Sequence, residues 1–168
     1  APCIVRLAMR ADVVGLCGLL GVPQHHSATV IQSGAACRVP YQQILALRAH
    51  DMEIVEQLER DWFNAVEDAD RIMAGLNQGS GRSRMARALL YLRSTLAPNE
   101  PLWLRRADLA SLLAVTPVTV ARLLREFKAQ QLLVERDRWC IGIDVTRLRA
   151  IAGDGRWSDT PDSSMQPH

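Results

Sequence analysis

The sequence is poor in aromatic residues, which make up 5% of its 168 residues, whereas 48% of the residues are hydrophobic. A core built mainly from Leu, Ala and Val is more typical of a helical protein than of a β-sandwich. No run of apolar residues reaches the length of a membrane span. The first residues, APCIVRLAMRAD, lack the pattern of a secretory signal. We therefore expect a cytoplasmic protein.

Residue combinations that perform catalysis or hold metals are also scarce. No CxxC pair occurs, so the cysteines fit buried free thiols better than an iron–sulfur or redox site. They are Cys3, Cys17, Cys37 and Cys140. His25 and His26 are adjacent and would point opposite ways in an extended segment. The sequence offers no Gly-rich phosphate loop and no convincing Ser/His/Asp order, so it predicts neither an enzyme, a metal site nor a cofactor.

Positive charge is concentrated in one part of the chain, although the formal net charge is only +2. Residues 80–152 hold thirteen Lys and Arg against six Asp and Glu, a net charge of +7. Residues 49–76 hold eight acidic residues against two Arg, a net charge of −6. A basic block of this size points to a polyanionic partner, and nucleic acid is the first candidate.

The first part of the chain combines β-branched runs with turn-rich links. CIVRLA and SATVIQ, within residues 3–32, predict short strands, and the β signal ends near Pro40. Residues 41–49 and 82–93 predict short helices, and the loop STLAPNEP follows the second. Between them, NQGSG at residues 77–81 ends a longer helix and forms a hinge, with Ser80 as the cap of the next helix.

That longer helix, residues 51–76, has two apolar stripes. One has the 3-4 spacing of a coiled-coil seam. This predicted seam consists of Val55, Leu58, Trp62, Ala65, Ala69, Ile72 and Leu76. A second stripe lies beside it, formed by Met52, Phe63, Val66 and Met73. The pattern favours a dimerisation helix, in which one stripe packs on its own chain and the other on a second copy. Burial of both stripes within one monomer is the alternative.

A helix-turn-helix is predicted over residues 104–130. The first helix ends near Leu113, with Leu109, Leu112 and Leu113 turned inward. Thr116 can cap the second helix, and Pro117 fits its first position, where a missing N–H has no cost. The second helix has a buried stripe and, opposite it, a basic face. The buried stripe is Val120, Leu123, Leu124 and Phe127. An ordinary helical hairpin with a solvated basic face is the alternative.

Residues 132–143, LLVERDRWCIGI, predict a β-hairpin with a polar turn at Arg136-Asp137-Arg138. A hairpin directly after the second helix is typical of the winged form of the motif. We expect the turn to bring arginines close to a phosphate backbone.

In their order, these segments resemble the Crp/Fnr family of bacterial transcription regulators. Residues 11–45 resemble the last part of the family's cyclic-nucleotide-binding β-roll, and the seam helix resembles its dimerisation helix. RADLASLLAVTPVTVARLLREFKAQQLL resembles its DNA-binding helices, and the hairpin resembles its wing. The β-roll looks truncated at the N-terminus, so we expect a fragment, or strands completed by a partner.

The effector positions depart from the family pattern. Cyclic-AMP members use Glu in a Gly-Glu-Leu-Gly turn and Arg before Ser-Ala, where this sequence has Leu16 and His26. Leucine accepts no hydrogen bond from a ribose, and a neutral histidine lacks the bidentate grip of arginine. Leu16, His26 and Ser27 are the expected effector positions, and cyclic AMP is not the expected effector.

The second helix of the motif, which the resemblance identifies as the DNA-recognition helix, also departs from the family pattern. Cyclic-AMP members begin it with Arg and Glu and place a second Arg four residues after that Glu, where this sequence has Pro117, Val118 and Arg122. Arg122 can still bind O6 and N7 of a guanine, and Val118 can contact a thymine methyl group. The expected base-reading residues are Val118, Thr119 and Arg122. The expected phosphate contacts are Arg105, Arg106, Thr116, Arg125, Lys128 and Arg136.

Together the segments predict an α+β chain in four parts. These are a partial β-roll at 1–48, a dimerisation helix at 49–76, a winged helix-turn-helix at 77–152 and a disordered tail at 153–168. The expected function is a homodimeric DNA-binding regulator acting on a pseudo-palindrome. The resemblance also implies RNA polymerase as a partner. The alternative function is a sensing or interaction module whose basic face binds an acidic protein.

Overall fold

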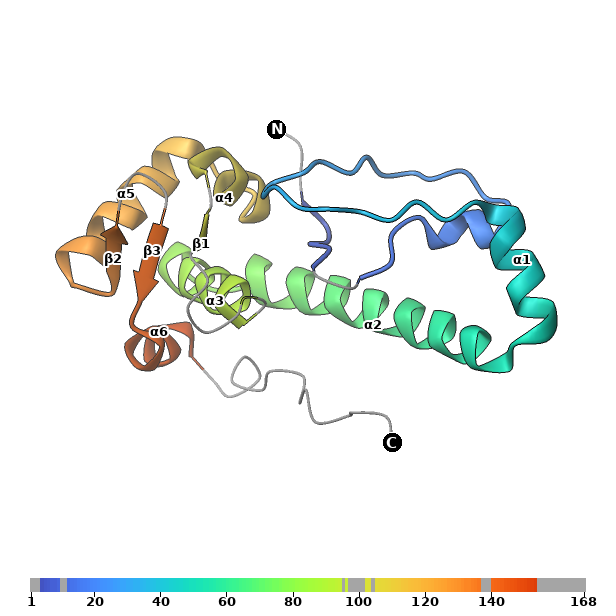
Figure 1. Ribbon diagram of the computed structural model, residues 1–168. Coiled ribbons are helices and arrows are strands. Elements are labelled where there is room, and N and C mark those ends of the chain that lie inside the picture. Colours follow the sequence, from blue (N-terminus) through green and yellow to red (C-terminus); the bar gives the residue numbers. More distant parts are fainter. Residues whose placement is uncertain are drawn as a thin grey trace. The chain divides into compact units, whose positions relative to one another are not determined.

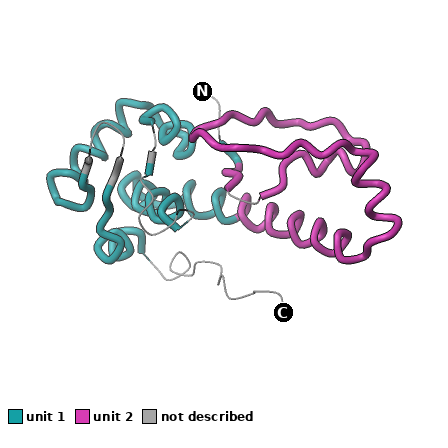
Figure 2. The backbone as a smooth tube through the Cα atoms, viewed as in Figure 1, with its two compact units in different colours: residues 1–5, 71–168 teal, residues 6–70 magenta. Residues whose placement is uncertain are grey.

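A computed structural model of the chain describes residues 4–9, 12–94, 96, 102–103, 105–136 and 140–153. Within these residues the chain forms six α-helices, one short 3-10 helix and three strands (Figure 1). The expected α+β class is therefore confirmed. The residues divide into an N-terminal unit, residues 6–70, and a C-terminal unit, residues 1–5 and 71–168 (Figure 2). Among the described helices, none is by itself long and apolar enough to cross a bilayer.

The N-terminal unit contains the 3-10 helix η1 (Leu16–Leu20), α1 (Tyr41–His50) and most of α2 (Met52–Asn77). Proline at position 40 precedes α1, and its carbonyl accepts the first turn's N–H of Gln43 at 3.0 Å. Asp51 then caps α2, because its carboxylate accepts the N–H of Glu53 at 3.0 Å and of Ile54 at 3.3 Å. The two helices expected here are confirmed to within one residue at each end.

The strands expected in residues 3–39 are not formed in the described residues 4–9 and 12–39, and this prediction was wrong. Most of these side chains are exposed, as Val30 illustrates, and residues 21–40 run as irregular chain (Figure 1). A β-branched run becomes a strand only where a neighbouring strand exchanges hydrogen bonds with it. The backbone hydrogen bonds described between residues 12 and 39 close local turns instead.

The C-terminal unit packs four helices around a small antiparallel sheet. The helices are α3 (Gly81–Ser94), α4 (Arg106–Leu112), α5 (Pro117–Ala129) and α6 (Val145–Ala152). The strands are β1 (Leu102–Trp103), β2 (Leu133–Arg136) and β3 (Cys140–Ile143). The sheet order is β1-β3-β2, and β2 pairs with β3 from Leu133↔Ile143 to Arg136↔Cys140.

The core of this unit centres on α3, whose middle is fully buried. Leu89 of α3, Leu109 of α4, Phe127 of α5 and Leu148 of α6 all reach it with no exposed surface. The expected α3, α4, α5 and hairpin are confirmed with small shifts at their ends. The expected wing turn at 137–138, most of the loop at 94–101 and the tail after Gly153 lie outside the described residues.

Two elements of this unit were not predicted. Strand β1 is two residues long and offers no periodicity to detect. Helix α6 does have local signals: Asp144 accepts the N–H of Arg147 at 3.0 Å as a cap, and Leu148 and Ala152 are buried one turn apart.

Candidate nucleic-acid interface

Helices α4 and α5 form the helix-turn-helix expected from the sequence. Their axes are bent by 106° at the intervening turn, within the range of about 90–120° for this motif. Leu109, Leu112 and Leu113 are buried as expected, and Ala110 is buried where a larger side chain would separate the helices.

The turn after α4 has a backbone geometry that favours glycine. Ala114 has a φ of 48°, in the left-handed region, and the N–H of Val115 donates to the carbonyl of Ala110 at 3.0 Å. This six-to-one hydrogen bond is typical of a Schellman turn, which places glycine most often at the Ala114 position. Alanine pays a steric cost there because of its Cβ.

Replacing Ala114 by Gly is expected to raise the free energy of unfolding by about 0.5–1 kcal/mol. Relief of the left-handed strain, about 1–2 kcal/mol, exceeds the entropy that glycine adds to the unfolded chain. Urea unfolding measures the difference. As a control, Ala121→Gly inside α5 should lower stability by about 0.5–1 kcal/mol. An Ala114→Gly variant no more stable than the wild type would contradict the expectation.

Helix α5 begins as the sequence predicts. The side chain of Thr116 accepts the N–H of Thr119 at 3.2 Å, and the two hydroxyl groups lie 3.0 Å apart. Pro117 occupies the first turn, where no intrahelical N–H is needed. The proline therefore begins α5 and does not interrupt it, because its fixed φ suits the first helical position.

The two faces of α5 separate as expected. The predicted buried stripe, from Val120 to Phe127, is buried throughout. Val118 is 79% exposed, and Arg122 and Arg125 are exposed with it. Among the described contacts, Arg122 forms no ion pair.

An open groove of about 440 Å³ lies over this exposed face. Its lining alternates guanidinium groups with small apolar side chains. The lining residues are Arg106, Pro117, Val118, Ala121, Arg122 and Arg125. Ala121 was not among the expected site residues, although its position three residues after Val118 and four before Arg125 places it on the same face. The groove offers cationic donors and apolar contacts together.

The other expected phosphate contacts are less uniform. Arg105 is exposed, but its guanidinium forms an ion pair with Asp108 at 3.0 Å. Thr116 is exposed and already serves as a cap, and Lys128 is half-buried near the far end of α5. The side chain of Arg136 lies outside those that the structure describes. From this set, Arg106 and Arg125 line the groove.

Part of the basic block faces inward, which a count of charges does not reveal. Arg84 donates to the carbonyls of Leu76 and Leu113. Arg87 donates to the carbonyls of Gly75, Gln78 and Ala152, at 2.8–2.9 Å. These arginines satisfy carbonyl groups at helix ends. The net charge of residues 80–152 therefore overstates the basic surface that the C-terminal unit presents.

The α2 stripes are arranged differently from the prediction. Ile72 and Leu76, the last two members of the predicted seam, are 2% and 0% exposed, so they belong to the chain's own core and not to a partner surface. This part of the predicted dimer interface was wrong, because the C-terminal end of α2 packs in the C-terminal unit. Val55, Leu58, Ala65 and Ala69 are half-buried.

An exposed apolar stripe remains on α2. Phe63 is 64% exposed, and four other large apolar side chains of the helix are also exposed. This exposed α2 stripe consists of Met52, Trp62, Phe63, Val66 and Met73. Apart from Trp62, these are the residues of the second stripe in the sequence. Exposed apolar surface at helical spacing indicates a packing partner.

The expected effector positions lie in the N-terminal unit. Leu16 is the first residue of η1 and is buried, whereas His26 and Ser27 are exposed in irregular chain. Within the described part of the chain, no three His, Cys, Asp or Glu side chains are grouped to hold a metal ion.

Comparisons with known proteins point to one family. Residues 83–151 match the model of the Crp-like helix-turn-helix domain. The chain is 24% identical to the fumarate and nitrate reduction regulatory protein of Vibrio cholerae, over 89% of this chain and 62% of that protein. It is 22% identical to electron transport regulator A of Shewanella oneidensis, over 88% of this chain and 62% of that protein. The chain thus spans about three fifths of these relatives.

Solved structures show a similar fold. FixK2 from Bradyrhizobium japonicum matches with a TM-score of 0.64 and 21% identity, over 70% of this chain and 61% of that one. A CRP-family transcriptional regulator from Thermus thermophilus matches with a TM-score of 0.55 and 23% identity, over 64% and 57% of the two chains. Residues 83–151 therefore form a Crp-like helix-turn-helix domain, which agrees with the observed helix-turn-helix followed by a hairpin.

Proposed function

We propose that this chain is a sequence-specific DNA-binding transcription regulator that acts as a homodimer on a pseudo-palindromic operator. The observation that carries the proposal is the groove at the start of α5, where exposed arginines flank apolar side chains. An α-helix fits the major groove of DNA, where base edges offer hydrogen-bond acceptors and thymine methyl groups. The relatives' names, which describe regulators, support the same function.

The residues of the groove divide by chemistry into base-reading and phosphate-binding sets. The guanidinium of Arg122, which forms no ion pair within the described residues, can bind O6 and N7 of a guanine. Val118 and Ala121 can contact a thymine methyl group. Arg106 and Arg125 also line the groove and suit phosphate contacts, which fix the register of the helix on DNA.

The exposed α2 stripe supports the dimer. Its large apolar side chains are the surface that a second copy of α2 would bury, with the half-buried Val55, Leu58, Ala65 and Ala69 beside them. A two-fold axis along paired helices presents two copies of α5 to successive major grooves, about 34 Å apart. Such a dimer requires an operator with two inverted half-sites.

Selection from random duplex DNA tests the function directly. The purified chain should enrich a motif with two inverted half-sites, each containing a guanine. Failure to enrich any motif at low ionic strength would contradict the proposal and favour the alternative, in which the basic face binds an acidic protein.

We also propose that the protein acts in the bacterial cytoplasm. We propose further that it responds to a signal other than cyclic AMP, because Leu16 and His26 replace the residues that hold cyclic AMP in the resembling family.

Replacing Arg122 by Ala is expected to cost about 1–3 kcal/mol at one base pair of each half-site and to relax the preference there. The reason is the removal of a bidentate hydrogen-bonded pair with guanine. Titrations on operators that differ only at that base pair measure the discrimination.

Arg125→Ala is the matched control, since it removes the same charge from the same helix. It should weaken binding to all sequences about equally and reduce the slope of log K against log salt by about one for each phosphate that no longer has a cation beside it. If Arg122→Ala also weakens all sequences equally, Arg122 contacts phosphate and does not read a base.

A further inference from the structure

The row of side chains that carries Arg122 continues along α5 to an acidic residue. The members of this row follow one another at four-residue spacing, so they share one face of the helix. They are Val118, Arg122, Glu126 and Gln130. A carboxylate four residues from an arginine on a helix lies close enough to form an ion pair with it. Such a pair would engage the guanidinium of Arg122, which the proposed function assigns to a guanine.

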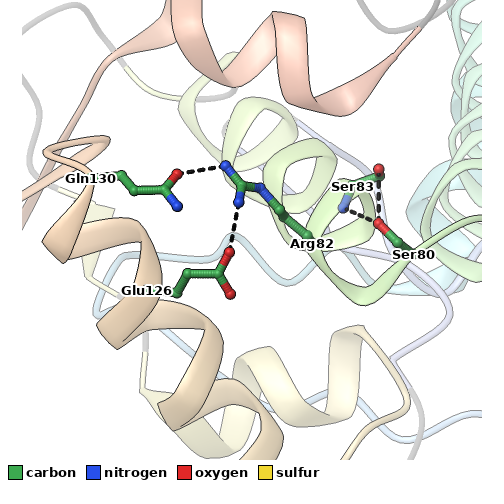
Figure 3. Close-up of polar contacts among 5 residues, drawn as sticks. All are labelled: Ser80, Arg82, Ser83, Glu126 and Gln130. Carbon is green, nitrogen blue, oxygen red and sulfur yellow. Dashed lines mark hydrogen bonds and ion pairs between the residues drawn. The ribbon is translucent and has the colours of Figure 1, made fainter.

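Arg82 of α3 holds this carboxylate instead. Its Nη1 donates to Oε1 of Glu126 at 2.7 Å, and its Nη2 donates to Oε1 of Gln130 at 2.5 Å (Figure 3). The guanidinium also lies over the ring of Phe127, 5.8 Å from its centroid. A planar guanidinium with two acceptors one helical turn apart and an aromatic ring below it is fixed in direction.

Arg82 is itself fixed by the start of α3. The N–H of Ser83 donates to Oγ of Ser80 at 3.1 Å, so Ser80 caps the first turn of α3, which contains Arg82 (Figure 3). Both side chains of the Arg82–Glu126 pair are about two-thirds buried, so solvent and salt screen the pair less than an exposed one. The pair spans 44 residues of sequence and lies wholly within the C-terminal unit.

We propose that Arg82 is a positioning residue that keeps Arg122 available for DNA by holding the Glu126 carboxylate on the α3 side of the recognition helix. This inference rests on the proposed DNA-binding function. Arg82 is not among the residues that line the groove, so we assign its effect on base reading to the Glu126 carboxylate that it holds. Without Arg82, the carboxylate is released to pair with Arg122 and to repel the phosphates of a bound duplex.

Three variants of the full chain test this mechanism on the selected operator. Arg82→Ala should lower affinity about three- to tenfold, by the competing ion pair and the added repulsion in both half-sites. It should also relax the preference at the base pair that Arg122→Ala affects. Glu126→Gln keeps an acceptor oxygen for Arg82 and should bind at least as well as the wild type. The double variant, Arg82→Ala with Glu126→Gln, should regain the affinity and the base preference.

The controls separate this mechanism from a loss of folding and from a general charge effect. Thermal unfolding of each variant identifies a loss of affinity caused by unfolding. Arg149→Ala, at an exposed position of α6, removes one positive charge and should leave the base preference unchanged. The inference would be overturned if Arg82→Ala lost affinity and the added Glu126→Gln change did not restore it. It would also be overturned if Arg82→Ala left the base preference unchanged. Absence of DNA binding by the wild type would instead overturn the proposed function.

Discussion

Replacing Phe63 by Asp is expected to convert the proposed dimer to monomers and to lower affinity for a two-half-site operator at least a hundredfold. Phe63 is 64% exposed on the exposed α2 stripe, so the change should leave the monomer's own packing nearly intact. In the dimer, the new carboxylate would lie between two apolar surfaces, and burying an unpaired charge there is strongly unfavourable. Because it would meet its own copy across a two-fold axis, like-charge repulsion adds to the cost.

The large effect on DNA binding follows from bivalency. When one subunit is bound, the second half-site is reached at the effective concentration set by the dimer, and this coupling contributes about 10²–10⁴ in affinity. A monomer loses this coupling although its α5 is unchanged. Sedimentation equilibrium measures the mass, and titration of an operator and of a single half-site measures the two affinities. Single half-site binding should change little.

Asn64→Asp is the matched control, because it adds the same charge one position away, at an exposed site outside the stripe. It should remain a dimer and bind the operator like the wild type within a factor of a few. If Phe63→Asp also stays dimeric, the second copy packs on a different face of α2, and the assignment of the exposed α2 stripe to the dimer is wrong.

The parts of the fold that were predicted well follow from local rules. Thr116 and Pro117 start α5 through a hydrogen bond that spans three residues, and the spacing of Val120, Leu123 and Phe127 identifies its buried side. Each of these signals lies within a few residues of the structure it predicts. The exposed face of α5, and with it most of the groove, follows from the same periodicity.

The parts that were missed depend on distant partners. The β-branched runs before Pro40 report a preference for extended backbone but not whether another strand pairs with it. Periodicity identified two stripes on α2 but not which of them the chain buries. Ile72 and Leu76 were therefore assigned to the dimer interface, although the chain buries them itself. The Arg82–Glu126 contact joins residues 44 positions apart, and one sequence alone gives no sign that they meet.

Replacing Phe127 by Ala is expected to lower the free energy of unfolding by about 3–5 kcal/mol. The ring has no exposed surface, and it lies in the core of the C-terminal unit beneath the Arg82 guanidinium. Its removal leaves a cavity and withdraws the surface on which that guanidinium rests. A loss of this size is a large part of the 5–15 kcal/mol or so that stabilises a typical protein. Urea unfolding followed by circular dichroism measures it.

Val118→Ala on the same helix shortens an apolar side chain that is 79% exposed, so stability should change by less than about 0.5 kcal/mol. DNA selection should show the reverse order. Val118→Ala should alter the base preference near the guanine that we propose Arg122 reads. Phe127→Ala should keep the motif of its folded fraction and bind less only because fewer molecules are folded. Equal losses of stability in the two variants would mean that α5 does not pack on the core through the face that contains Phe127.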